Sequence, residues 1–430
     1  ITNDAFIRTT DDGHKKIVRE MLQKLWNKGE IEKRSYSGMY CTPCERFWTE
    51  KDVVNGNCPD CGRPVEHIEE KNYFFLMSKY QDKLIKHIEE NPGFILPEMR
   101  KNEVLGFLKN RTLGDLCISR PKARLAWGIP LPFDENYITY VWFDALLNYY
   151  SATKYLAPLK AEWWPADHHL IGKDILTTHA VYWSTMLMAL DMKLPKNIFA
   201  HGWWTVEGQK MSKSLGNVVD PNEVIERYGV DQFRYFLLRE VPFGLDGDFS
   251  IKALKGRING ELANELGNLL SRTIALILKN KKEGFPKRYD TKHISVPDTP
   301  TFFSRGLSEW SNAFLKNFDF FMGNLQFHHA IGHVVGAIKG WNKYAQKTAP
   351  WAEKDHDTLS NTLYNLAEGL RIVAVYLYPF MPESAQKIWE QLGIKNRIED
   401  SSFDKEAEWG KGNFNSMDIE KSPPLFPRVE

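Results

Sequence analysis

The segment from Asn197 to Glu223 constrains the fold more than any other part of this sequence. It opens with NIFAHGWWTV, whose β-branched and aromatic side chains predict a buried strand. Asp220, Pro221 and Glu223 predict the N-cap, first position and capping-box acid of a helix. The glycine-flanked polar string GQKMSKSLGNVVDP joins the two. A strand, loop and helix in this order are typical of a doubly wound α/β sheet, which binds ligands at such loops.

Lys210 and Lys213 lie on this loop with Ser212 between them. Paired ammonium groups suit a polyphosphate whose charge grows during a reaction, although an isolated KxxK is more often a solvated basic turn. The whole string resembles the KMSKS loop of class I aminoacyl-tRNA synthetases, which binds ATP during amino-acid activation. The resemblance implies that Lys213 stabilises the phosphates of ATP as pyrophosphate leaves, while Lys210 and Ser212 support it and Mg²⁺ enters with ATP as substrate.

Length and composition set broad limits on the protein. We expect two or three domains, because 430 residues exceed one ordinary core. The net charge of +1 means that any tRNA contact must come from local patches. The longest apolar run, from Ile372 to Met381, is far shorter than the roughly 20 residues of a membrane span, and the polar first residues do not resemble a signal peptide. We therefore expect no membrane association and a cytoplasmic protein.

Four of the five cysteines form a strong metal-binding pattern. Cys41, Cys44, Cys58 and Cys61 are spaced C-x2-C-x13-C-x2-C, which allows two CxxC turns to meet as a tetrahedral thiolate site. Such a site has no open position, so we expect one structural Zn²⁺ per chain and a reducing compartment. The alternative is a zinc ribbon that binds nucleic acid. The fifth cysteine, Cys117, is expected to be a buried structural thiol.

The cysteine knuckle resembles the insertion in the connective peptide of methionyl-tRNA synthetases, in the version that binds one zinc. The run DLCISRPKARLAWGIPLP, residues 115–132, resembles the end of the same insertion. The insertion occupies only about the first third of the chain, judged against usual domain sizes. That is too small for the large hydrolytic editing domain of the isoleucyl, valyl and leucyl enzymes.

Two aromatic stripes predict helices that face one pocket. The first helix begins near Tyr140, and the second follows a strand that breaks at Gly172. Helical spacing aligns Trp142, Ala145, Leu146 and Tyr149 on the first, and Ile175, His179, Tyr182, Trp183 and Met186 on the second. Such stripes are usually core. However, a histidine in an apolar stripe needs a polar partner, and aromatic walls with polar tips suit a thioether.

These segments also resemble the methionine pocket of the same family. The resemblance assigns the methionine side chain to Trp142, Ala145, Tyr149, Ile175, His179, Tyr182 and Trp183. Leu146 and Tyr182 depart from residues that some relatives carry. Gly172, Lys173 and Asp174 lie at the end of a predicted strand, where ribose and phosphate groups bind in such a sheet. The resemblance assigns Asp174 to the ribose of ATP, and His201 and Gly202 to the neighbourhood of its adenine.

After residue 250 the apolar period is helical and predicts an α-helical bundle. Periodicity alone is equally consistent with a general packing or interaction domain. GNLLSR, residues 267–272, and APW, residues 349–351, resemble the segments with which the family reads the CAU anticodon. The resemblance implies that Trp351 stacks on an unpaired base while Asn268 and Arg272 bind base edges. The alternative for Trp351 is a buried core side chain.

The fold expected is α/β, the second half of a class I Rossmann-type nucleotide-binding domain with a zinc-knuckle insertion, followed by an all-α anticodon-binding bundle. We expect the end of the first Rossmann half and a linking helix in 1–34, and the connective peptide in 35–130 with its knuckle in 41–61. The second Rossmann half would occupy 131–250 and the stem-contact and anticodon-binding domain 251–430. The function implied is ATP-dependent ligation of L-methionine to its tRNA through methionyl-adenylate.

One motif of the family is missing from the sequence. No His-Ile-Gly-His occurs, and HVVG, residues 333–336, lies in a predicted bundle helix. We therefore expect this chain to hold half an active site. The other half would lie on a second polypeptide or would have been removed by proteolytic cleavage. A tRNA-binding protein that has lost catalysis is the second hypothesis, and a structural zinc protein is the third.

Overall fold

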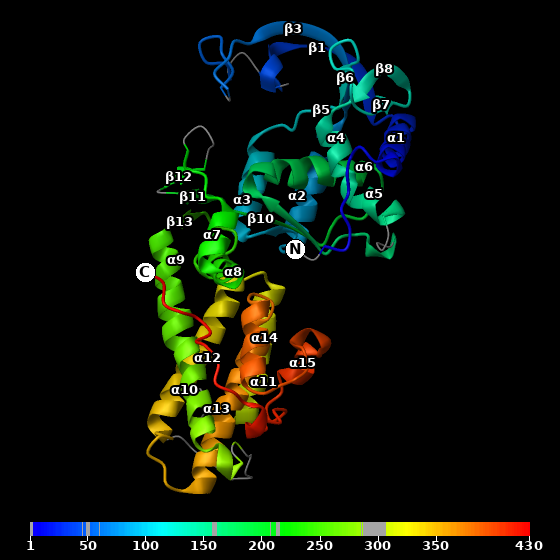
Figure 1. Ribbon diagram of the computed structural model, residues 1–430. Helices are drawn as coiled ribbons and strands as arrows, with labels where there is room; N and C mark the ends of the chain where they lie inside the picture. The colour runs from blue at the N-terminus through cyan, green and yellow to red at the C-terminus, as the bar shows by residue number, and fades with distance from the viewer. Residues whose placement is uncertain are drawn as a thin grey trace. The chain divides into compact units, whose positions relative to one another are not determined.

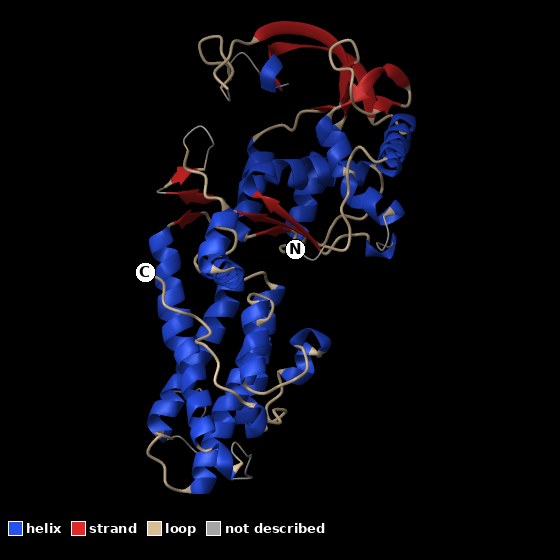
Figure 2. Ribbon diagram, viewed as in Figure 1, coloured by secondary structure: helices blue, strands red, loops and turns tan. Residues whose placement is uncertain are grey.

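The computed structural model describes residues 3–44, 46–48, 52–59, 61–156, 161–206, 208–211, 216–284, 286 and 307–430. The chain divides into two compact units, Ile1–His201 and Gly202–Glu430, and the boundary between them in the sequence falls in the green part of the colour bar (Figure 1). The longer strands belong to the first unit, and helices dominate the second (Figure 2). A mixed α/β fold followed by a helical bundle is thereby confirmed. Within the described residues, no helix has both the length and the apolarity needed to cross a bilayer.

A three-stranded parallel sheet lies in the first unit. Its order is β4 (Ile95–Leu96), β10 (Asn197–His201) and β9 (His168–Gly172). The helices nearest to it in sequence are α2 (Gln81–Glu90), α3 (Glu98–Asn110) and α6 (Ser184–Ala189). Every residue of α6 is buried, because this helix lies in the core of the unit.

A second, antiparallel sheet of the first unit carries the cysteine knuckle at one end. Its order is β2 (Arg46–Trp48), β1 (Ile31–Cys41), β3 (Glu66–Phe75) and β5 (Leu116–Cys117). The β1–β3 ladder is buried where Ile31 pairs with Phe75 and more exposed toward the knuckle, where β1 ends. The remaining elements of this region are α1 (Asp12–Asn27) and the small sheet β6 (Ser119–Pro121), β8 (Asp134–Thr139) and β7 (Pro130–Leu131).

The structure corrects the single strand expected over residues 197–206. The first strand, β10, ends at His201, and β11 (Trp204–Val206) belongs to another sheet, with β12 (Gln209–Lys210) and β13 (Gly247–Phe249). Gly202 packs so closely on the backbone of Leu245 that a Cβ there would lie 2.3 Å from its carbonyl atoms. The amide of Trp203 donates to Asp246 Oδ1 at 2.8 Å. The chain therefore exchanges one set of strand partners for another at this glycine.

The loop that follows is also more regular than expected at its start. Lys210 lies on β12, which pairs antiparallel with β11, so this lysine is on a hairpin strand rather than on an irregular loop. The next helix, α7 (Pro221–Tyr228), begins as predicted. Asp220 is its N-cap and accepts from the amide of Asn222 at 2.8 Å, and Pro221 occupies the first position.

Both predicted pocket helices are interrupted. The first is two helices, α4 (Val141–Leu146) and α5 (Asn148–Tyr155). The Asn148 side chain donates to the backbone oxygen of Ala145, and such a bond competes with the helical ladder. The second passes through a 3₁₀ turn, η4 (Lys173–Ile175), and a π-helical turn, η5 (Thr178–Trp183), before α6. Wide turns of this kind often occur at functional sites.

The second unit is organised around α13 (His356–Leu377), in which every residue from 359 to 377 is buried. A helix that is buried on all sides forms the core of a bundle. It is packed against α10 (Asn268–Lys279), α12 (Phe327–Thr348), α14 (Pro382–Gln391) and α15 (Phe403–Glu406). The other helices are α8 (Val230–Arg239), α9 (Ile251–Arg257), the π-helix η7 (Ile258–Gly267) and α11 (Leu307–Gly323). Leu262, Leu266, Leu269 and Leu270, which follow the helical apolar period of the sequence, are all buried.

An ion pair inside the bundle ties the segment after α15 to α13. The Glu368 carboxylate is fully buried and accepts from the backbone amides of residues 410–412 at 2.7–3.1 Å. It also accepts from Arg371 at 2.8 and 2.9 Å. Arg371 donates in turn to the carboxylate of Glu406 and to the backbone oxygen of Glu408. Because every partner is charged or a backbone group, this pair is satisfied despite its burial.

Glu368→Ala should lower the free energy of unfolding by about 3–5 kcal/mol, because it removes one of the two carboxylates that pair with the buried Arg371 charge and leaves three backbone amides without their acceptor. Urea denaturation of the purified chain measures this value. The control is Lys395→Ala, which breaks the exposed 3.0 Å pair with Asp418 and should cost at most about 1 kcal/mol. Equal losses in the two variants would contradict the role assigned to burial.

Candidate functional site

A tyrosine–histidine pair lies in the aromatic wall that the sequence predicts. Tyr149 Oη is 2.8 Å from His179 Nε2, and His179 Nδ1 is 2.9 Å from the backbone oxygen of Ile175. Because a carbonyl only accepts, His179 carries its proton on Nδ1, and its Nε2 then accepts from the Tyr149 hydroxyl. Burial lowers the pKa of His179, although the Ile175 carbonyl partly opposes this shift. The pair is therefore uncharged at neutral pH.

His169 is a member of this cluster that the sequence analysis did not single out. Its Nε2 accepts from Trp183 Nε1 at 3.1 Å, and its ring centroid lies 4.1 Å from that of Tyr149. Burial, with a smaller contribution from the neighbouring histidine, lowers the pKa of His169 to about 3. The signal that would have found it is strand alternation, since His169 shares the buried side of β9 with Ile171.

The predicted methionine-binding residues lie on elements that pack together. Tyr149, Ile175 and Tyr182 are partly buried against the core cluster that contains Trp183. Trp142 and Ala145 are half-buried on α4, which packs against η5. His179 and Trp183 are both buried on η5. The first unit thus contains an aromatic wall whose polar atoms are tied to one another.

The predicted nucleotide-binding residues of the first unit lie at the carboxyl ends of two parallel strands. Gly172 ends β9 and is paired with His201 at the end of β10. A Cβ at Gly172 would lie 2.4 Å from Asp174 Oδ1 and 4.0 Å from His201 Cε1. Gly172, Asp174 and His201 therefore lie together, with Lys173 beside them on η4. This is the edge at which open parallel sheets bind ligands. Gly202 follows in the second unit, against the Leu245 backbone.

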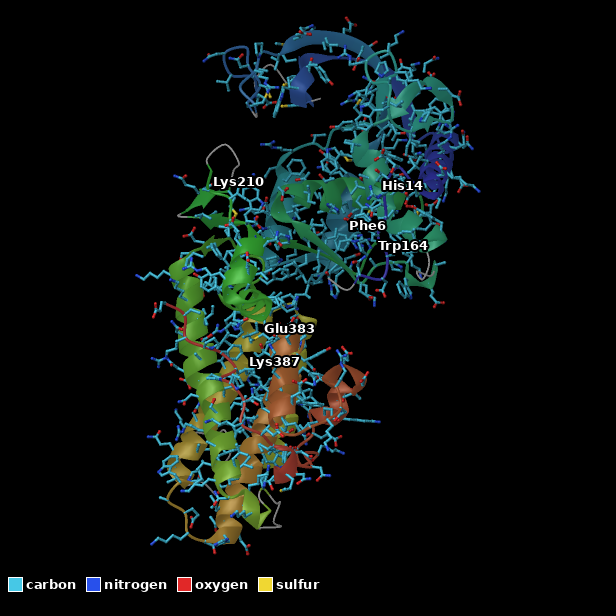
Figure 3. All side chains as sticks on the ribbon, in the orientation of Figure 1. Phe6, His14, Trp164, Lys210, Glu383 and Lys387 are labelled. Carbon is cyan, nitrogen blue, oxygen red and sulfur yellow. The ribbon has the colours of Figure 1, made fainter. Side chains whose placement is uncertain are left out.

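The lysine hairpin, β11–β12 of the second unit, presents Lys210. This side chain, labelled in Figure 3, is exposed, and its Nζ lies 4.2 Å from the centroid of the Trp203 ring. An ammonium group over an indole face is a cation–π contact. Lys213 and Ser212, the other two predicted catalytic residues, lie outside the described residues.

Asp246, just before β13, and Asp248, on β13, hold the lysine hairpin. Asp248 Oδ1 accepts from the Gly208 amide and from the Thr205 hydroxyl, both at 2.8 Å, and Asp246 accepts from the amide of Trp203. The hydrogen bond from the Gly208 amide, followed by that from Thr205, lowers the pKa of Asp248. Both aspartates therefore fix backbone that surrounds Lys210.

A groove of about 640 Å³ lies on the bundle, within the second unit. Trp351 lines it with 48% of its surface exposed, so the alternative of a buried core tryptophan is wrong. The Arg272 guanidinium lies 5.1 Å from the centroid of the Trp351 ring. Asn268 is exposed as the first residue of α10, one turn before Arg272. The groove is lined by Glu265, Arg272, Lys339, Asn342, Lys343, Gln346 and Trp351.

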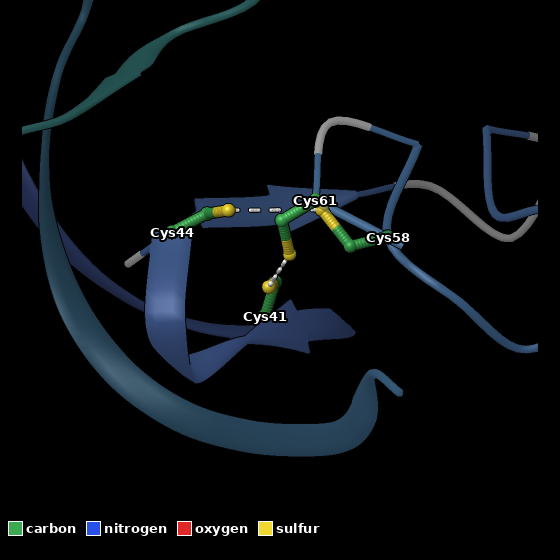
Figure 4. Close-up of side chains that lie close together, drawn as sticks. All are labelled: Cys41, Cys44, Cys58 and Cys61. Carbon is green, nitrogen blue, oxygen red and sulfur yellow. Dashed lines mark hydrogen bonds between the residues drawn. The ribbon is translucent and has the colours of Figure 1, made fainter. Parts of the chain in front are cut away.

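The four predicted metal ligands converge on one point, as Figure 4 shows. Cys41 ends β1, Cys44 ends the following 3₁₀ turn, and Cys58 and Cys61 lie on one loop. In this loop the Gly62 amide donates to the Cys58 carbonyl at 2.8 Å, with Gly62 in the left-handed conformation, φ 70°. A glycine adopts this conformation without strain, which allows the second CxxC turn to close.

The donor set fits zinc. All four sulfurs lie within 4.8 Å of one another, with Cys41 and Cys61 at 3.5 Å and Cys44 and Cys58 at 3.9 Å. A tetrahedron with Zn–S bonds of about 2.3 Å has sulfurs about 3.8 Å apart. The Cys61 thiol and burial raise the pKa of Cys44 to about 12. Thiols that are crowded in this way lose their protons readily only when a cation binds all four sulfurs and takes the place of the protons.

The comparisons with known proteins agree with this arrangement. A family model described as "tRNA synthetases class I (M)" matches residues 1–67 and 63–274. A second model, "Anticodon-binding domain of tRNA ligase", matches residues 307–422. This chain belongs to the class I methionyl-tRNA synthetase family.

Individual members of the methionyl-tRNA synthetase family match the whole chain. It is 46% identical to "Methionine--tRNA ligase" of Caldanaerobacter subterraneus subsp. tengcongensis and 43% identical to that of Bacillus subtilis. In each case 100% of this chain is covered, and the chain spans 66% of the relative's length. A solved structure of "Mycobacterium tuberculosis methionyl-tRNA synthetase in complex with methionyl-adenylate" superposes with a TM-score of 0.87 and 37% identity. The superposition covers 100% of this chain and 83% of the solved chain.

We expect one zinc per chain at neutral pH and its release as the pH falls, because protons compete with zinc for the four thiolates. A colorimetric zinc reporter titrated with acid measures the release. Cys61→Ser should lose the metal at neutral pH. The control is Cys117→Ser, which changes a half-buried thiol, bonded to the Ser119 carbonyl and to Arg120, that is not among the four ligands. Zinc-free wild-type protein, purified under reducing conditions, would contradict the assignment.

Proposed function

We propose that this chain acts in the ATP-dependent ligation of L-methionine to its tRNA. Methionine attacks the α-phosphate of ATP to give methionyl-adenylate and pyrophosphate, and the adenylate then esterifies the terminal ribose of the tRNA. The observation that carries the proposal is the uncharged Tyr149–His179 pair, in which His179 is buried and Tyr149 is partly buried in an aromatic wall. Family membership and likeness to a solved relative bound to methionyl-adenylate support it.

In this proposal the aromatic wall receives the methionine side chain. A thioether is polarizable and uncharged. It therefore makes favourable contacts with aromatic rings and has no desolvation cost when it leaves water. The lowered pKa values of His169 and His179 keep both rings neutral, which suits an uncharged guest. Trp142, Ala145, Ile175, Tyr182 and Trp183 would supply the remaining walls.

The same proposal assigns ATP-binding roles to charged and polar residues. Asp174 would bind the ribose, with Gly172 and Lys173 beside it, and His201 and Gly202 would lie near the adenine. Lys213 would stabilise the charge that develops as pyrophosphate leaves, supported by Lys210 and Ser212, with Mg²⁺ entering with ATP. These roles consist of positioning and charge stabilisation, for which no covalent intermediate on the protein is needed.

The tRNA would be recognised by the groove on the bundle. Trp351 is half exposed and the Arg272 guanidinium lies beside its ring, and both flat groups suit stacking on an unpaired base. Asn268 adds an amide that can bind a base edge. A structural zinc ion in the cysteine knuckle would stabilise the insertion without taking part in the chemistry.

The adenylation site further requires a His-Ile-Gly-His segment, a motif that these 430 residues do not contain. We propose that this segment is supplied by additional sequence or by a second polypeptide. Methionine-dependent ATP–pyrophosphate exchange tests this. The chain alone should be nearly inactive, and exchange should appear when a fragment that carries the motif is added. Full exchange by the chain alone would refute the half-site proposal.

A chain that binds tRNA but stays inactive after the fragment is added would instead favour the alternative, a catalytically incomplete tRNA-binding protein. The feature that favours this alternative is the same missing motif.

In the completed enzyme, Tyr149→Phe should raise the KM for methionine roughly tenfold, because it leaves His179 Nε2 buried without its donor. The KM for ATP should stay unchanged, and discrimination against norleucine, which has a methylene in place of sulfur, should weaken. The matched control is Tyr150→Phe, which alters the adjacent tyrosine, whose ring packs on Trp164. An equal rise of the KM for methionine and for ATP would contradict the assignment of Tyr149 to the side-chain pocket.

A further inference from the structure

The groove on the bundle contains one acidic side chain among basic ones. Glu265 lies on η7 and is half-buried, while Lys339 and Lys343 on α12 and Arg272 on α10 are exposed around it. Lysine and arginine side chains attract phosphates, whereas a carboxylate repels them. The phosphate backbone therefore does not explain why the groove holds a carboxylate.

Glu265 is held in place by a neutral partner. The Asn342 amide donates to Glu265 Oε2 and to the Glu265 backbone oxygen, both at 3.1 Å, and to the backbone oxygen of Ile338 at 3.2 Å. These contacts connect η7 with α12 across 77 positions of sequence. Because Asn342 is uncharged, this contact positions the carboxylate without neutralising it.

An ionised carboxylate accepts hydrogen bonds and donates none. Its complement in a nucleic acid is therefore a donor on a base edge, and carboxylates in known complexes accept from the N4 amino group of cytosine. Trp351 and Arg272 offer the flat surfaces on which an unpaired base stacks. The base edge would then face the walls of the groove, where Glu265 lies.

We propose that Glu265 reads the exocyclic amino group of an unpaired cytosine or adenine in the tRNA anticodon, and that Asn342 positions its carboxylate for this contact. The inference rests on the proposed function of the groove as the tRNA site. It adds a base-specific contact to the stacking surface. Uracil, which carries a carbonyl oxygen where cytosine carries the amino group, would face the carboxylate oxygen and be rejected.

The test measures binding of the full chain to a short RNA hairpin with a CAU loop, by fluorescence anisotropy. Two further hairpins lack one amino group each, with 2-pyrimidinone riboside in place of cytosine or purine riboside in place of adenine. Glu265→Ala should weaken binding of the CAU hairpin roughly 10- to 100-fold, as expected for a lost charged hydrogen bond. It should leave the affinity for one of the two modified hairpins nearly unchanged, and that hairpin identifies the base.

Matched variants keep the result interpretable. Glu390→Ala removes the same charge from an exposed position on α14 and should leave all affinities within about twofold. Glu265→Gln retains the shape and a neutral acceptor, so its loss should be smaller than that of Glu265→Ala. Melting temperatures of all variants verify that the bundle is folded.

Two results would overturn the inference while leaving the tRNA groove intact. If Trp351→Ala weakens binding but Glu265→Ala strengthens it for every hairpin, the carboxylate only repels phosphate. If Glu265→Ala weakens all three hairpins equally, the side chain has no role in base recognition. If neither Trp351→Ala nor Glu265→Ala changes any affinity, the groove is not the tRNA site, and the proposed function of this surface fails together with the inference.

Discussion

The aromatic wall of the first unit depends on hydrogen bonds that pair its polar atoms with one another, because these atoms lie in an apolar core. Trp183 donates to His169, Tyr149 is paired with His179, and His179 is tied to the Ile175 carbonyl. Removing any one member would leave a buried donor or acceptor without a partner, which costs about 1–3 kcal/mol. These bonds hold four rings in fixed orientations, and they do so only while both histidines are neutral. Burial ensures this by lowering their pKa values.

In the second unit, carboxylates have the corresponding role by gathering backbone amides. Asp248 fixes the lysine hairpin through the Gly208 amide, and Glu368 fixes the segment after α15 through three consecutive amides. Charge-assisted bonds of this kind are stronger than neutral ones and are directional. They order stretches of chain that have too little regular structure to be positioned by packing. Glu265 differs, because its known partner is a side-chain amide, which leaves a carboxylate facing a groove.

The features proposed for function divide between the two units according to their chemistry. The uncharged aromatic wall and the nucleotide edge at Gly172 belong to the first unit, where the parallel sheet brings strand ends together. The exposed cations Lys210 and Arg272 belong to the second unit. An apolar guest requires a preformed wall, whereas phosphates and RNA are attracted over longer distances by charges that stay in water.

The sequence by itself determined features that arise from local chemistry. The cysteine spacing predicted a four-sulfur cluster, Asp220 and Pro221 predicted a helix start, and the helical apolar period after residue 250 predicted the bundle. Each of these depends on residues that lie within 20 positions of one another in the chain. Only the tertiary structure decided where β10 ends, because Gly202 meets the backbone of Leu245. It also decided that Trp351 is exposed and that Asn342 reaches Glu265. Such contacts join residues that are distant in the chain, and neither propensity nor periodicity encodes them.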